Sequence, residues 1–180
     1  MRTSLHMSIL LLAFAGCRTV TVDQPLTDSL GGNDPKTQMD FWHTLAERRI
    51  TSNDEAFHGL LLFLDEQDPA ESYRQRVEIL KRRGLLSQDF DRPANEAVHR
   101  GTLAVAVVRA LELEGGLMLR LSPHSPRYST RELEHLDIFP VSSPNQTFSG
   151  LQFLGVLGRV EDFQRGAVNA ANTWPGQAPP

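Results

Sequence analysis

The residue types that most often carry out chemistry are present in this chain, but they are scattered along it. Its six histidines include no HExxH motif and no pair four residues apart, the spacing that places two metal ligands on one helix face. Ser149 precedes a glycine outside any GxSxG motif, and Glu132 and Glu134 would point apart on a helix. Because these residues supply no nucleophile, acid–base pair or ligand set, we expect a protein that is not an enzyme and holds no metal and no cofactor.

A basic segment is the second feature that could bind a ligand, and it carries Arg74, Arg76, Lys81, Arg82 and Arg83. The whole chain has 18 Lys and Arg against 22 Asp and Glu, a net charge of -4. This mild acidity gives no reason to expect nucleic acid as a partner. We interpret the segment as a solvated helix end that compensates the helix dipole, with contact to anionic lipid or wall polymer as the alternative.

Cys17 is the only cysteine, so an internal disulfide is excluded. It follows an apolar stretch, Met7 to Ala15, that is too short for a membrane span of about 30 Å and has the length of a secretion signal. The segment Phe14-Ala15-Gly16-Cys17 resembles a bacterial lipobox. The resemblance implies a lipoprotein signal peptide over residues 1–16 and lipidation of Cys17, with an ordinary signal peptide as the alternative. We therefore expect a cell-envelope lipoprotein, anchored at the outer membrane or on the periplasmic face.

The mature chain divides by composition into three parts. Residues 17–36 include a Gly-Gly-Asn-Asp-Pro run and little periodicity, which predicts a flexible tether. Residues 165–180 end in a segment rich in proline and alanine and are expected to be a disordered tail. Residues 37–164 remain as the folded part.

Helix signals dominate the folded part, so the expected fold class is all-α in one compact domain. Capping motifs predict helix starts near Thr37, Ser52, Asp68, Ser129 and Ser149, and a further helix is expected from about 99 to 114. Apolar residues recur at helical spacing after each start. Alternating leucines over 117–121 suggest a short strand.

The helices fall into a repeated pattern of helix, turn with an aliphatic residue, loop and second helix. The turn residues are Ile50, Leu85 and Ile138, and the second helices start at steps of about 50 residues. We therefore expect three helix-loop-helix repeats, over about 37–66, 68–116 and 128–164.

This pattern resembles tandem S-layer homology repeats, a family of cell-wall binding modules. The middle unit carries the resemblance, through Leu80-Lys81-Arg82-Arg83-Gly84-Leu85-Leu86 and His99-Arg100-Gly101-Thr102-Leu103-Ala104. The family implies a three-lobed helical domain that binds anionic wall polysaccharide in grooves between lobes. There an arginine and backbone amides at the start of the second helix hold the anion.

Carried over residue by residue, the resemblance gives Arg100 and Gly101 as one ligand site. Ser149 and Gly150 would offer a hydroxyl and amides, and Trp42 matches a recurrent tryptophan that serves either the core or a sugar platform. Two of the three arginine positions lack arginine here, and Thr102 replaces the family's glutamate. The expected function is binding of cell-wall glycan or a surface-layer component, with a scaffold that docks another envelope protein as the alternative.

Overall fold

The computed structural model describes residues 19–172, with side chains as far as residue 167, and its regular structure is helical. Cys17, the leader and residues 173–180 lie outside the described residues. The helices are α1 (Thr27–Leu30), α2 (Pro35–Glu47), α3 (Asn53–Asp65), α4 (Tyr73–Arg82), α5 (Arg100–Ala110), α6 (Leu117–Leu121), α7 (Pro126–His135) and α8 (Gly150–Asn172). Within the described part, the only β-type pairing is three isolated bridges, so the all-α prediction is confirmed.

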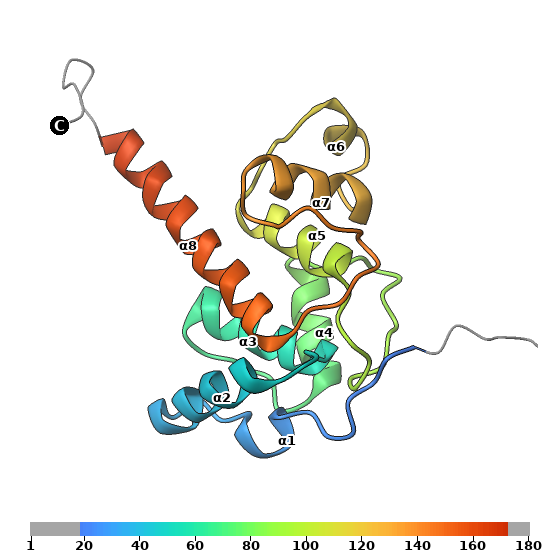
Figure 1. Cartoon of the computed structure of the whole chain (residues 1–180), viewed down its shortest axis with the longest axis vertical. Helices are drawn as coiled ribbons and strands as arrows, with labels where there is room; N and C mark the ends of the chain where they lie inside the picture. The colour runs from blue at the N-terminus through green and yellow to red at the C-terminus, as the bar shows by residue number, and fades with distance from the viewer. Residues whose placement is uncertain (1–18, 173–180) are drawn as a thin grey trace, which may run out of the picture.

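The helices contact one another in an order that closes on itself. Helix α3 packs against α4, α5 packs against α7, and α8 returns to pack against α2 (Figure 1). The long helices form consecutive pairs, α2 with α3, α4 with α5 and α7 with α8. Each contact joins the second helix of one pair to the first helix of the next pair. The last helix of the chain thereby lies on the first long one.

The segments that lead into α3, α5 and α8 are joined by backbone hydrogen bonds in the same cyclic order. The first N–H of α3 donates to the Glu96 carbonyl (2.7 Å), that of α5 to Gln146 (2.8 Å) and that of α8 to Arg48 (2.9 Å). Glu96 lies just before α5, Gln146 just before α8 and Arg48 just before α3. The helix starts therefore meet at a shared centre instead of opening onto solvent.

Two turns between helices have the same geometry. Gly84 follows α4 with φ 70°, and the amides of the next two residues donate to the Leu80 carbonyl at 2.9 and 3.3 Å. Asp137 follows α7 with φ 57°, and the next two amides donate to Leu133 at 2.9 and 3.0 Å. Both helices end in a left-handed C-cap that satisfies their last carbonyls.

One hydrophobic core links all of the long helices. Its largest fully buried side chains come from α2, α3, α4, α5, α7 and α8 and from the segments before them. Leu80 of α4, Leu103 of α5 and Leu133 of α7 are each at most 1% exposed. The long helices are thus held mainly by burial of their apolar faces.

Residues 19–36 do not form the expected flexible tether. The Val20 carbonyl accepts from Ala97 N (2.8 Å), and Val22 N donates to the Asn95 carbonyl (2.8 Å). Val22 and Leu26 are buried, and Leu26 N donates to Glu55 Oε1 (3.0 Å). Because these partners lie far along the sequence, the local composition did not reveal them.

The expected disordered tail and the expected short strand are also corrected. Helix α8 continues to Asn172, so residues 165–172 are helical where a tail was expected to begin. Residues 117–121 form α6 in place of a strand. No neighbouring strand pairs with them in the described part of the chain, and an isolated alternating segment gains nothing from an extended conformation.

Three helix starts differ from the predicted capping motifs. Helix α2 starts at Pro35 with Asp34 as its N-cap, before the predicted Thr37. Helix α4 starts at Tyr73 with Ser72 as its N-cap, because the predicted cap Asp68 instead bonds to His58. Helix α7 starts at Pro126, one turn before the predicted Ser129, since proline suits the first position of a helix.

Candidate binding groove

Arg100, which the family resemblance assigned to an anion site, is engaged within the protein. It is the first residue of α5 and 6% exposed. Its Nε donates to the Thr147 carbonyl and its Nη2 to Gln152 Oε1, both at 3.2 Å, and its Cζ lies 4.9 Å from the Phe148 ring centroid. Burial lowers the pKa of Arg100, an effect that Glu134 opposes. The guanidinium therefore joins α5 to the start of α8.

The two glycines of the predicted sites also serve packing. Gly101 N donates to the Pro144 carbonyl (2.8 Å), and a Cβ on Gly101 would lie 2.5 Å from the Pro126 Cβ. A Cβ on Gly150 would lie 1.5 Å from the Leu45 carbonyl oxygen. Both positions require glycine because another chain segment approaches the backbone there, and their amides already have acceptors.

Ser149 caps α8 instead of facing a ligand. Its Oγ accepts from Gln152 N (3.2 Å), while Gln152 Oε1 accepts from Ser149 N (3.1 Å), which is a capping box. The same Oε1 accepts from Arg100. The structure thus brings Arg100, Ser149 and Gly150 into one interface between helix starts.

Trp42 has a core role. Its half-buried ring lies edge-on to Phe41, with centroids 5.1 Å apart. A Cβ on Gly59 of α3 would lie 3.1 Å from the indole, so this ring fills the space left by the glycine. Of the two readings left open for Trp42, the packing favours the core over the sugar platform.

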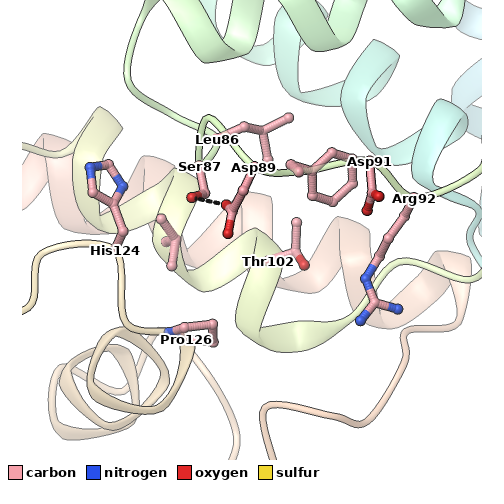
Figure 2. A pocket seen from close by; sticks show the side chains of 10 residues that line it. Leu86, Ser87, Asp89, Asp91, Arg92, Thr102, His124 and Pro126 are labelled. Atoms are coloured by element: carbon pink, nitrogen blue, oxygen red, sulfur yellow. Dashed lines mark hydrogen bonds between the residues drawn. The ribbon is translucent and has the colours of Figure 1, made fainter.

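A cavity of about 230 Å³ lies beside this interface, between the loop after α4, the first half of α5 and the start of α7. We call it the α5–α7 groove (Figure 2). Its apolar lining consists of Leu86, Phe90, Val105 and Pro126, and its polar lining of Ser87, Asp89, Asp91, Arg92, Thr102 and His124. The groove adjoins the predicted site at Gly101, because Pro126 contacts both.

The carboxylate of Asp89 is held in its charged form. Ser87 Oγ donates to Asp89 Oδ1, and this hydrogen bond, with smaller contributions from Lys81 and His124, lowers the pKa of Asp89. Figure 2 shows His124 and Arg92 at opposite ends of the groove, with Asp89 and Thr102 between them. A ligand would therefore meet hydrogen-bond acceptors in the middle and donors at both ends.

The side chains that line the groove can donate and accept hydrogen bonds. The Ser87 hydroxyl donates to Asp89, and the lowered pKa of Asp89 makes its carboxylate a weak base. In residues 19–172, no three His, Cys, Asp or Glu side chains gather as ligands of a metal ion. Sequence reasoning missed the groove, although the polar run from Ser87 to Arg92 directly after the Gly84 turn was a usable signal.

A second polar cluster is buried in the core. His58 Nδ1 lies 2.6 Å from Asp68 Oδ2, and Arg76 bonds both to Asp68 and to Asp54 Oδ1, the latter at 2.6 Å. Thr27 Oγ1 of α1 donates to Asp54 at 2.5 Å. Burial raises the pKa of Asp68, but the bonds from His58 and Arg76 outweigh it, so the net shift is downward. All four ionisable groups are at most 5% exposed, so this cluster joins elements and is closed to an incoming substrate.

The comparisons with known proteins identify no relatives. No family model matches the chain, and neither a curated protein nor a solved structure matches it. None of the helices in residues 19–172 is long and apolar enough to cross a membrane.

Proposed function

We propose that this chain is a non-catalytic cell-envelope lipoprotein that binds a hydroxyl-rich, uncharged segment of cell-wall glycan in the α5–α7 groove. The observation that carries the proposal is the exposed carboxylate of Asp89 beside the apolar lining of a cavity of about 230 Å³. A sugar ring has polar hydroxyls at its edge and apolar C–H groups on its faces. Carboxylates accept strong hydrogen bonds from hydroxyls, and the apolar lining of the groove would pack against the apolar face of the sugar.

The charge of the groove sets the class of glycan. Asp89 and Asp91 are two acidic groups in its lining, and they would repel an anionic polymer. The anion site that the family resemblance implied, at Arg100, is engaged by Thr147 and Gln152. Wall glycan therefore remains the proposed ligand class, but the proposed site is the groove and an uncharged sugar is favoured.

A three-unit architecture is part of the proposal. The units are the repeats expected over about 37–66, 68–116 and 128–164. The cyclic order of helix contacts and the matching turns after α4 and α7 support it. The lining residues of the groove would then lie in the second unit and in the linker that leads to the third unit.

The membrane anchor is proposed from the leader and the lipobox-like segment that ends at Cys17. Two acyl chains or more, at about 0.8 kcal/mol per buried CH2, hold a protein stably on a bilayer. Replacement of Cys17 by serine should release the protein from membranes, as followed by membrane fractionation.

Sedimentation with purified wall polysaccharides tests the glycan proposal. The unacylated Cys17→Ser protein should bind neutral wall glycan and leave anionic polymer in the supernatant. Asp89→Asn with Asp91→Asn should weaken glycan binding at least tenfold, since it removes charge-assisted acceptors without changing their shape. Asp23→Asn, an exposed aspartate outside the groove, is the matched control and should bind as before. Failure of the parent protein to bind either polysaccharide would reject the glycan proposal.

The alternative, an adaptor that docks another envelope protein, is favoured by one observation. Val141 and Leu151 are 94% and 69% exposed, and Leu151 lines a second cavity of about 190 Å³ with Pro140 and Phe148. A contiguous apolar patch on a protein surface marks a contact site. A stable envelope-protein partner that is lost in Leu151→Asp, with no glycan bound, would favour the adaptor.

A further inference from the structure

The described chain is fixed to the domain from its first residues. Thr21 forms a bridge with Glu96, flanked by the hydrogen bonds from Ala97 N to Val20 O and from Val22 N to Asn95 O, both 2.8 Å. Further along, Leu26 is 7% exposed. The segment 19–26 is therefore part of the folded body.

This leaves very little chain between the body and Cys17. Whatever path residue 18 takes, two residues span at most about 7 Å, since an extended chain rises no more than about 3.6 Å per residue. A free segment over 17–36 would have allowed the domain to lie up to about 70 Å away by the same rule. A lipid on Cys17 thus lies next to one particular part of the protein surface.

We infer that the acylated Cys17 holds the domain directly against the lipid bilayer in one orientation. The side that faces the lipid carries residues 19–24 and the loop 93–97, which we call the anchor face. This inference rests on the lipid anchor of the proposed function. The partner is the headgroup layer of the membrane in which the acyl chains are inserted.

Asp23 and Glu96 are the charged residues of the anchor face, and Arg92 and Arg48 border it. Arg92 bonds to Glu96, and Arg48 donates to the Gln24 carbonyl (2.8 Å) with its Nε 3.5 Å from Glu55. Because these arginines are paired, they offer little net attraction to anionic lipid. Val20, the first apolar residue of the described chain, is 47% exposed. The short covalent link therefore sets the orientation, and salt should not alter it.

The proposed orientation also determines where the α5–α7 groove lies relative to the membrane. Arg92 lines one end of the α5–α7 groove and bonds to Glu96 of the anchor face. That end of the groove would lie close to the headgroups. The bound glycan segment would accordingly be one that lies at the membrane surface.

Site-specific quenching tests the inference on acylated full-length protein in phosphatidylcholine vesicles that contain a headgroup nitroxide quencher. Cys17 is the only natural cysteine and its thiol is acylated, so an introduced cysteine is the only thiol to label. Fluorophores go on Val20→Cys and Gln24→Cys at the anchor face, and on Met118→Cys of α6 and Gln164→Cys of α8. Figure 1 shows α8 leading away from the point where the described chain enters.

The expected result is quenching at Val20 and Gln24 at least threefold stronger than at Gln164 and Met118, unchanged between low and high salt. Insertion of 20 Gly and Ser residues between Arg18 and Thr19 should make the four sites equal. Equal quenching without the insertion, or strongest quenching at Met118, would overturn the fixed orientation and leave the anchor intact. A Cys17 peptide of unacylated mass would overturn the anchor, and this inference with it.

Discussion

At the scale of single residues, the three helix starts that meet at the centre are capped differently. Ser52 and Ser149 each accept a hydrogen bond from an amide of their helix, whereas His99 makes no side-chain cap bond within the described residues. Burial, aided by the charge of Arg92 and opposed by Glu96, lowers the pKa of His99 from 6.5. The position thus lacks a cap and disfavours the protonated side chain.

His99→Ser should therefore raise the free energy of unfolding by about 1 kcal/mol at neutral pH. The gain should grow as the pH falls below 6.5, because the unfolded wild-type chain binds a proton at His99 more readily than the folded one. Urea unfolding at pH 7.5 and 5.5 measures both effects. Equal dependence of stability on pH in the two proteins would contradict the role of His99.

Two arginines of α4 differ sharply despite their closeness in sequence. Arg76 is 4% exposed between Asp54 and Asp68, whereas the side chain of Arg74 is 90% exposed and pairs only with Glu78 in the described residues. The interpretation of the whole basic segment as a solvated helix end was therefore wrong for Arg76. Its partner carboxylates lie on other elements, so the local pattern of charges did not distinguish it.

Arg76→Met should lower the free energy of unfolding by about 3 to 5 kcal/mol, because it leaves two buried carboxylates without their counter-charge. Arg74→Met, the matched control on the same helix, should change it by about 0.5 kcal/mol or less. Chemical denaturation of both variants gives the comparison. Similar small losses in both would show that the buried cluster contributes little to stability.

At the scale of elements, local signals predicted helices well and their boundaries less well. The end of α4 at Gly84 was predictable, since a glycine after basic residues marks a left-handed C-cap. The start of α4 was not, because Asp68 bonds to His58 of α3 in place of capping. The α5–α7 groove escaped prediction for a similar reason. Its walls come from three segments that the sequence separates.

The close approach of α8 to α2 can be tested by substitution of glycines in α8. Gly150→Ala should prevent stable folding or lower the free energy of unfolding by several kcal/mol, since its Cβ would lie 1.5 Å from the Leu45 carbonyl oxygen. Gly158→Ala, on the same helix with no other described atom within 4 Å of its Cβ, should raise stability by about 0.5 to 1 kcal/mol. Thermal unfolding by circular dichroism separates the two. A stable Gly150→Ala protein would exclude this close approach.

At the scale of the whole molecule, the helical class was predicted and the extent of the fold was not. The sequence placed the folded part at 37–164, but residues 19–36 and 165–172 also belong to regular or packed structure. Val22 and Leu26 appear isolated in a segment rich in turn residues. They become buried only because the loop before α5 and the start of α3 lie against them.

Truncation measures how much this first segment contributes. A soluble protein that starts at Thr19 should fold with full stability, whereas one that starts at Thr27 should lose about 2 to 4 kcal/mol through the exposure of core surface next to Val22 and Leu26. Urea denaturation of both proteins checks this. Equal stability of the two proteins would contradict this packing and would support the flexible tether that the composition predicted.

The contact of Gly150 with Leu45 joins a helix made late in synthesis to one made early. The part of α2 that packs on α8 stays uncovered until α8 has been made, and such long-range closure slows folding. For the exported lipoprotein proposed above, this delay would be useful. A polypeptide that threads through a translocation pore must still be unfolded, and the packing of α2 stays incomplete until α8 follows it.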